Sequence, residues 1–247
     1  MKYSRLSLLF LAAVFFMGCG SAPQIVHKDY IYEKILFGTQ RINFDIHLEN
    51  IGNSGKIYEL INNLIYNHKN FDEYVEYREK DFIGDPNEAA YPPMIDEDGT
   101  EYFYHSDLIE KYAIIFNSNT HIIFEKNVYL YDGGAHGNYG IRYFIIDIKE
   151  EKILDIDDLM YPIPDGLLKE IIEANYTIHY YLRENIWPPD TVNFYNKNIT
   201  LIWNTYAITP YSNGIIQIDI PDEIIEPYLT DKGKVLKKLT IKEINNR

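Results

Sequence analysis

The sequence predicts an α+β fold made of antiparallel sheets with packed helices, arranged as two small lobes. Short segments in which apolar and polar residues alternate recur along the chain, as half-buried strands require, and segments with helical spacing separate some of them. The two kinds of segment do not alternate strictly, which argues against a parallel sheet built from strand–helix–strand units. A clear example of the alternating pattern comprises Ile42, Phe44, Ile46 and Leu48.

Residues 1–18 are typical of a cleaved export signal. Lys2 and Arg5 precede a run at 6–16 that is apolar apart from Ser7 and is too short to remain as a membrane span. Cys19 follows a small residue just beyond that run, as in bacterial lipoproteins, so we expect cleavage before Cys19 and a lipid on its thiol. The alternative is an ordinary secretory signal with an incidental cysteine. Because Cys19 is the only cysteine, a lipidated chain keeps no thiol for a disulfide or a metal site.

The chain is acidic, with 37 Asp and Glu against 23 Lys and Arg and a net charge of −14. Without the two basic residues of the signal, 37 acidic side chains face 21 basic ones, a net charge of −16. Such a field repels nucleic acid and anionic lipid headgroups and attracts basic proteins. We therefore expect no nucleic-acid partner, and expect the membrane to be contacted through the lipid on Cys19.

Beyond the signal, the sequence suggests a tether, two domains and a tail. The expected segments are a tether at 19–29, an N-terminal α+β domain at 30–130, a C-terminal domain at 131–230 and a tail at 231–247. In the N-terminal domain, Asn70 and Glu73 have the spacing of a capping box at the start of a helix. The expected elements of this domain are strands at 30–37 and 39–48, a helix through 57–65, a second helix from Asn70, a loop at 84–100, and strands at 112–116 and 121–131.

The C-terminal domain has one strongly amphipathic segment, at 165–184, whose apolar residues recur at helical spacing. Asp157 and Asp158 stand where a helix could be capped, and Pro221 suits the first turn of another helix. The expected strands are at 139–148, 152–156, 191–195, 199–203 and 215–220.

The loop at 130–140, with the sequence LYDGGAHGNYG, is the most distinctive stretch of the chain. Gly133 and Gly134 can supply the positive φ that a tight connection needs, while the later glycines of the loop would relieve crowding where the strand resumes. His136 then has two interpretations: it hydrogen-bonds backbone groups and holds the loop, or it acts as a general base with a carboxylate such as Asp132. Exposed backbone N–H groups in such a loop also suit a ligand carbonyl or carboxylate.

Three stretches, in this order and spacing, resemble one family of extracytoplasmic domains. They are YDGGAHG at 131–137, DIDDLM at 155–160, and YAITPYSNG at 206–214 followed by IDIP at 218–221. They are similar to the signature segments of the domain found in RsiV-type anti-sigma factors, in PdaC-type peptidoglycan deacetylases and in uncharacterised lipoproteins. The preceding residues, 28–130, resemble the smaller domain that accompanies it only in the order of strands and helix.

The resemblance implies a sensor or binding module rather than a catalytic domain. In the anti-sigma factors the domain binds lysozyme outside the cell, and in the deacetylases a separate domain carries the chemistry. We expect neither a cytoplasmic anti-sigma segment nor a deacetylase domain in this chain. The seven histidines include no H-x-x-x-H pair, and no nucleophile elbow or phosphate-binding loop is present. We therefore expect no cofactor and no metal.

The expected function is a non-catalytic module of the bacterial cell envelope, periplasmic or at the cell surface, that binds a peptidoglycan fragment or a basic protein such as lysozyme. The alternative is a cell-wall glycan hydrolase or deacetylase that uses His136 with Asp132. A third possibility is a structural envelope component without a small ligand. The candidate ligand-binding residues are Tyr131, Gly133, Gly134, His136 and Tyr211.

Overall fold

The fold is that of a computed structural model, which describes residues 24–245 except 37–39, 53–54, 84–93, 96, 103, 133–134 and 176–186. The predicted signal, Cys19, Gly133 and Gly134 lie outside the described residues, as does the second half of the helix predicted at 165–184. The α+β class is confirmed, because two sheets dominated by antiparallel pairs carry several packed helices.

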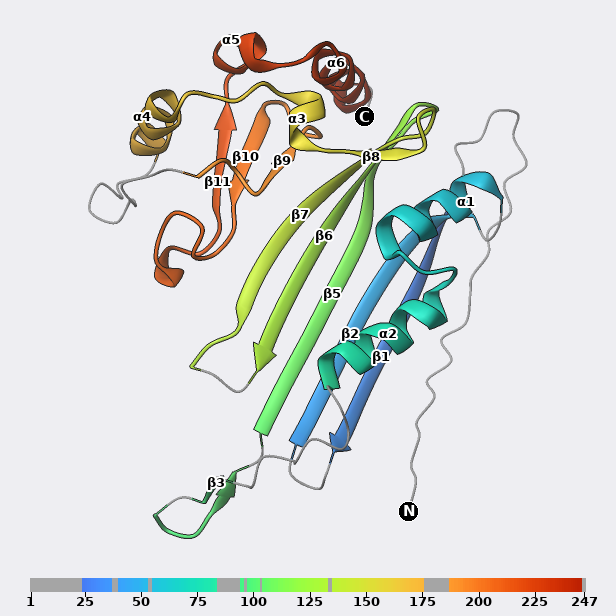
Figure 1. The fold of residues 1–247 in the computed structure, drawn as a ribbon, viewed down its shortest axis with the longest axis vertical. Coiled ribbons are helices and arrows are strands. Elements are labelled where there is room, and N and C mark those ends of the chain that lie inside the picture. Colours follow the sequence, from blue (N-terminus) through green and yellow to red (C-terminus); the bar gives the residue numbers. More distant parts are fainter. Residues whose placement is uncertain are drawn as a thin grey trace.

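A six-stranded sheet forms the body of the molecule, in the order β1-β2-β5-β6-β7-β8 (Figure 1). All neighbouring strands in it are antiparallel except β2 and β5, which are parallel. A parallel pair needs a crossover connection, and the helical segment between β2 and β5 provides it. The strands are β1 (Ile25–Leu36), β2 (Gln40–Ile51), β5 (Tyr104–Asn117), β6 (His121–Asp132), β7 (Asn138–Asp147) and β8 (Lys152–Leu154).

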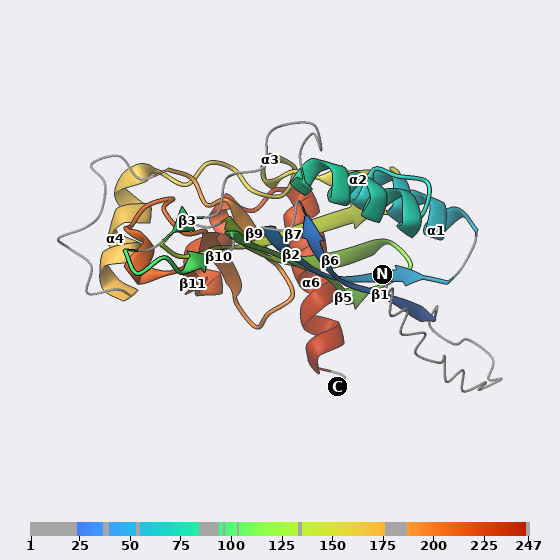
Figure 2. The ribbon, with the colours of Figure 1, turned by 90° about the horizontal axis from the view of Figure 1, so that it is seen from below.

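The crossover lies on one face of the large sheet (Figures 1 and 2). It consists of α1 (Lys56–Ile61), a π-helical turn η1 (Asn62–Tyr66) and α2 (Phe71–Ile83). The side chain of Asn70 accepts a hydrogen bond from the Glu73 N–H, as a capping box requires, but the Glu73 carboxylate accepts from Lys69 instead of Asn70. A short hairpin of β3 (Met94–Ile95) and β4 (Glu101–Tyr102) follows, partly within the loop predicted at 84–100.

A buried ion cluster fastens α2 to the sheet. The carboxylate of Glu110, on β5, is 0% exposed and accepts hydrogen bonds from Arg78 and Tyr74 of α2, at 3.1 Å and 2.6 Å. Lys126 of β6 lies 2.8 Å from the same carboxylate. Burial alone would raise the pKa of Glu110, but the charges of Lys126 and Arg78 outweigh it and hold that pKa below its ordinary value.

The large sheet supports two hydrophobic cores, one on each face. Because side chains alternate along a strand, Ile122 packs under α1 and η1 while its neighbour Ile123 packs into the C-terminal part of the chain. Ile146 and Ile145 on β7 divide in the same way. The two lobes expected from the sequence are thus two cores that share one sheet.

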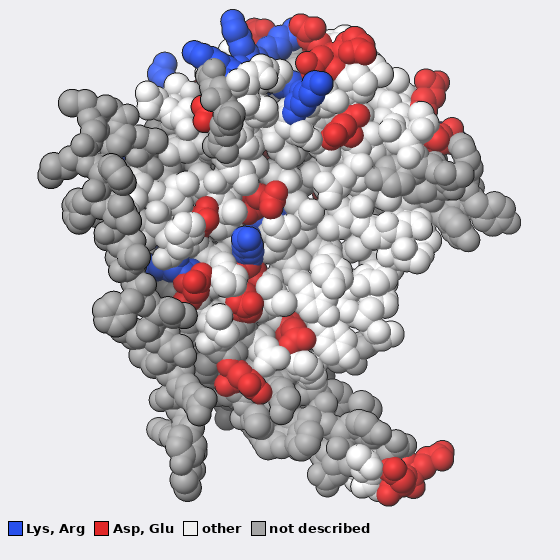
Figure 3. All heavy atoms as spheres, turned by 180° about the vertical axis from the view of Figure 1, so that it is seen from behind, with Lys and Arg blue, Asp and Glu red and all other residues white. Residues whose placement is uncertain are grey.

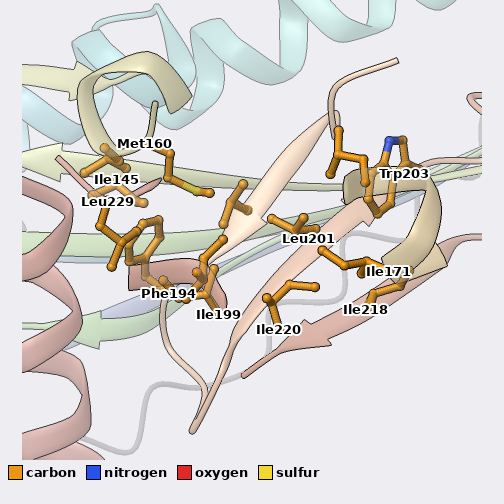
Figure 4. Packing of buried hydrophobic residues seen from close by; sticks show 14 of the residues in the cluster. Ile145, Met160, Ile171, Phe194, Ile199, Leu201, Trp203, Ile218, Ile220 and Leu229 are labelled. Atoms are coloured by element: carbon orange, nitrogen blue, oxygen red, sulfur yellow. The ribbon is translucent and has the colours of Figure 1, made fainter. Parts of the chain in front are cut away.

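A second sheet, in the order β11-β10-β9, packs beside β7 with its helices (Figure 1). All five residues of its central strand are buried. The close view shows three of them, Ile199, Leu201 and Trp203, in a cluster that also contains Ile145 of the large sheet (Figure 4). The strands are β9 (Thr191–Asn193), β10 (Ile199–Trp203) and β11 (Ile216–Ile220). The helices are α3 (Ile156–Leu159), α4 (Asp165–Asn175), α5 (Asp222–Ile225), α6 (Asp231–Asn245) and the 3-10 turns η2 (Tyr211–Asn213) and η3 (Glu226–Tyr228).

Several boundaries differ from those expected. β1 begins at Ile25, inside the predicted tether, because Ile25 pairs with Ile51 at the far end of β2. The domain boundary expected at 130/131 falls within β6, whose partner β7 continues the same sheet. The predicted tail forms α6, which buries Leu236 completely and packs closely against α3.

The helices of the C-terminal part begin at or close to the positions that the local sequence predicts. α4 begins at Asp165, as predicted. The N-cap of α3 is Asp155, two residues before the expected cap at Asp157, so the helix begins at Ile156. The Asp158 carboxylate completes a capping box, because it accepts a hydrogen bond from the Asp155 N–H at 3.0 Å. Pro221 precedes the first turn of α5 as the N-cap.

Candidate functional site

Two loops that are far apart in sequence meet on the surface between the sheets. His136, between β6 and β7, stacks on Tyr211 of η2 with ring centroids 3.6 Å apart and planes inclined by 13°. The hydroxyl of Tyr206, which follows β10, lies 3.2 Å from Nε2 of His136. We call these three residues, His136, Tyr206 and Tyr211, the ring cluster. It joins the two motifs that the sequence analysis singled out.

Tyr206 has an unusual backbone. Its φ is 68°, in the left-handed region that non-glycine residues rarely adopt. The turn that contains it is closed by a hydrogen bond of 3.0 Å from the Ala207 N–H to the Asn204 carbonyl. Strained conformations persist where surrounding contacts hold them, and they gather at functional sites. The strain therefore marks the loop after β10 as a candidate binding element.

In the loop between β6 and β7, the backbone of Gly137 lies close to the ring of Tyr129. A Cβ atom at this position would overlap the ring of Tyr129, so any side chain there would require that ring to move. Tyr129 in turn packs against Tyr139, with centroids 4.6 Å apart. The space beside Gly140 is also restricted, but less than that beside Gly137, since a Cβ atom there would lie 3.1 Å from the side chain of Val128. The sequence interpretation that these two glycines relieve crowding agrees with this geometry.

Side chains replace a missing strand along the free edge of β7. The Asn204 amide accepts from the Ile141 N–H at 2.7 Å and donates to the Ile141 carbonyl at 3.1 Å. Thr205 donates to the carbonyl of Tyr139 at 3.0 Å, and the Thr191 hydroxyl accepts from the Tyr143 N–H at 2.9 Å. These bonds occur at alternate residues of β7, as a neighbouring strand would make them. They hold the loop that carries Tyr206 against the large sheet.

An open groove of about 590 Å³ lies beside the ring cluster and includes Tyr206. Its size falls within the range of small-molecule sites. It contains one basic and one acidic side chain, Arg142 and Asp190. The lining residues are Ile141, Arg142, Asp190, Asn204, Thr205, Tyr206 and Ala207.

Two tyrosines near the site, Tyr129 and Tyr143, have raised pKa values. Burial and the neighbouring hydroxyl of Tyr139 raise the pKa of Tyr129. Burial and a hydrogen bond of 2.7 Å to the Glu125 carboxylate raise the pKa of Tyr143 well above its ordinary value. Both phenols therefore keep their protons at physiological pH.

The structure brings together only some of the residues predicted for the site. His136 and Tyr211 are in contact, whereas Tyr131 packs edge-on against His105 of β5, with centroids 6.1 Å apart. Gly133, Gly134 and the side chain of Asp132 lie outside what the structure describes. The sequence analysis missed Tyr206 and Asn204. Tyr206 opens one of the quoted motifs, and that position was the available signal.

The described part of the chain contains neither a cluster of metal-binding side chains nor a helix suited to crossing a membrane. No group of three or more His, Cys, Asp or Glu side chains among those residues is arranged to hold a metal ion. None of the described helices combines the length and the apolar character that crossing a membrane takes.

Part of the chain matches a described protein family. Residues 156–223 match the family described as "Protein of unknown function (DUF3298)". This segment contains Tyr206 and Tyr211 and ends before the residues of α6; His136 precedes it. No curated protein matches the chain.

Two solved structures share the fold. A member of the DUF3298 family from Bacteroides fragilis superposes with a TM-score of 0.62 at 18% identity, covering 87% of this chain and 96% of that one. A DUF3298 family protein from Pseudomonas aeruginosa superposes with a TM-score of 0.54 at 17% identity, covering 84% and 95%. At such identities the likeness establishes the fold alone.

Proposed function

We propose that this protein is a lipid-anchored binding module of the bacterial cell envelope, held through Cys19, whose ligand is the glycan of peptidoglycan or a fragment of it. The ring cluster is the contact surface. The resemblance to RsiV-type and PdaC-type domains supports an extracytoplasmic role at the cell wall, and the match of residues 156–223 to a DUF3298 domain is consistent with that resemblance.

The observation that carries the proposal is the exposure of aromatic rings around a polar groove. Tyr206 is 44% exposed, Tyr139 is 52% exposed and His136 is also exposed. Exposed aromatic rings with polar tips suit sugars, which present apolar faces for stacking and hydroxyl groups for hydrogen bonds. Large exposed aromatics that gather at one place mark interaction sites more often than isolated ones do.

The surroundings of His136 favour binding over the hydrolase alternative. One face of its ring is covered by Tyr211, and Nε2 is held by the Tyr206 hydroxyl. A general base works best with a free nitrogen directed at the substrate and a carboxylate behind the ring. Among the described side chains, which do not include that of Asp132, no Asp or Glu pairs with His136.

A basic protein, for example a lysozyme, is the second candidate ligand, on the face of the large sheet opposite to α1 and α2. Asp29, Asp45 and Asp107 lie on this face, together with Ile31 and Ile109, which are 74% and 41% exposed. Figure 3 shows acidic side chains scattered over this side of the molecule, with Lys and Arg gathered mainly at one end. Charge complementarity would guide a basic partner to it.

Titration of the Cys19→Ser mature protein tests the proposal, with N-acetylated chitotetraose (the uncharged tetramer of N-acetylglucosamine, called chitotetraose below) and purified muropeptides as probes. Tyr206→Ala should weaken glycan binding about tenfold, because one stacking ring is lost. Tyr161→Ala removes a ring that is 58% exposed elsewhere and should leave binding unchanged. Equal weakening by both variants, or binding of lysozyme but of no glycan, would reject the glycan and favour the second candidate.

A further inference from the structure

The groove beside the ring cluster carries two opposite charges that, among the described residues, neither neutralise each other nor pair with other charged side chains. Arg142 is exposed, and its guanidinium lies over the ring of Phe144, 5.0 Å from the ring centroid. Among the described residues, no carboxylate forms a salt bridge with Arg142. In a chain with 37 acidic residues, an arginine held against an aromatic ring without an acidic partner is available for a ligand.

Asp190 stands in the same groove, and its carboxylate is oriented by the backbone. Its Oδ2 accepts the backbone N–H of Asn204 at 2.7 Å, which orients the carboxylate. Within the described part of the chain no Lys or Arg pairs with it. Both residues line one open hollow of about 590 Å³.

The other polar groups of the groove are already engaged. Both ends of the Asn204 amide bond Ile141, and the Thr205 hydroxyl donates to the carbonyl of Tyr139. Recognition in the groove therefore depends mainly on the separated charges of Arg142 and Asp190, next to the ring of Tyr206. A ligand complementary to this arrangement carries a carboxylate and an amine in one short chain.

We propose that the groove is a subsite for a short zwitterionic peptide, with its carboxylate on Arg142 and its amine on Asp190. This inference deepens the proposed function, because the groove shares Tyr206 with the ring cluster. A glycan stacked on the ring cluster would place an attached peptide in the groove. The ligand class is then a glycan that carries a peptide with a free amine and a free terminal carboxylate.

Calorimetric titration of the mature protein with Nα-acetyl-L-Lys-D-Ala-D-Ala tests the subsite, since this peptide has one amine and one carboxylate. Amidation of the carboxylate should weaken binding to the wild type about tenfold, the loss of one charge-assisted pair. Arg142→Gln should weaken binding of the peptide with the free carboxylate to the same extent. The variant should bind the amidated peptide and the free acid with equal affinity. Asp190→Asn should likewise remove the effect of acetylating the lysine amine.

Lys111→Gln, on another part of the sheet, removes the same charge and should change nothing. N-acetylated chitotetraose separates this proposal from the preceding one, because it has no charge and should bind the Arg142→Gln variant as it binds the wild type. If amidation still weakens peptide binding to the Arg142→Gln variant, or if the wild type binds no peptide, the peptide subsite is wrong. Neither result would contradict glycan binding by the ring cluster. Charge-dependent peptide binding without chitotetraose binding would instead retain the subsite and reject the glycan.

Discussion

The imidazole of His136 lies flat on the phenol of Tyr211, with centroids 3.6 Å apart and an angle of 13° between the planes. His136 belongs to a loop of the large sheet, and Tyr211 follows the central strand of the small one. The stack therefore closes the junction between the two sheets, at the point where Tyr206 and the groove are exposed.

Gly137→Ala should destabilise the fold by about 1–3 kcal/mol, since the new methyl group would overlap the ring of Tyr129. Denaturant unfolding followed by circular dichroism measures the effect. Gly166→Ala is the matched control, because a Cβ in that position of α4 meets nothing within 4 Å. If both variants were equally stable, close approach would not be the reason for glycine at 137.

Asn204→Ala should cost about 1–3 kcal/mol, because it leaves the N–H and the carbonyl of Ile141 without their partner. Amide hydrogen exchange should show faster exchange at Ile141 in particular. Asn138→Ala, at an exposed position at the start of the same strand, should have little effect on either measurement. Unchanged protection of Ile141 in Asn204→Ala would contradict the role of this side chain as a strand substitute.

The pKa of His121 should make the protein less stable in mild acid. Burial, with a contribution from the charge of Lys232, lowers the pKa of His121 in the folded state. The unfolded chain then binds more protons than the folded one as the pH falls below about 6.5, so stability decreases until the pH passes the folded pKa. His121→Gln should flatten this part of the stability–pH curve. A wild-type curve without such a decrease would show that the ring is not buried as described.

Cys19→Ala should release the protein into the soluble fraction, because the thiol is the expected attachment point of the lipid. Cell fractionation with immunodetection measures this. If the variant loses its leader and stays with the membrane, the lipid-anchor interpretation of residues 1–19 is wrong.

Strands whose apolar pattern is local were predictable, as the agreement between the expected strand 199–203 and β10 shows. The parallel pairing of β2 with β5 was not, because it depends on the path of the crossover and on no local pattern. The lysine-rich α6 was expected to be a tail. It is stabilised by tertiary contacts, chiefly the burial of Leu236, and these are not visible in a charged sequence.

The candidate site was predictable in part for the same reason. His136 and Tyr211 each stand in a recognisable motif, so both could be proposed from sequence. Their contact brings together two loops from different sheets and required the fold. Tyr206 was missed because its left-handed backbone conformation contradicts the ordinary preference of tyrosine.

The most direct test of the central claim is an NMR titration of the isotope-labelled mature protein with chitotetraose, observing the aromatic side-chain signals. We expect the ring signals of His136, Tyr206 and Tyr211 to shift together with one dissociation constant. The signal of Tyr161, exposed elsewhere, should stay in place. Shifts confined to other parts of the surface, or no shifts at saturating glycan, would contradict the assignment of the ring cluster as a glycan-binding site.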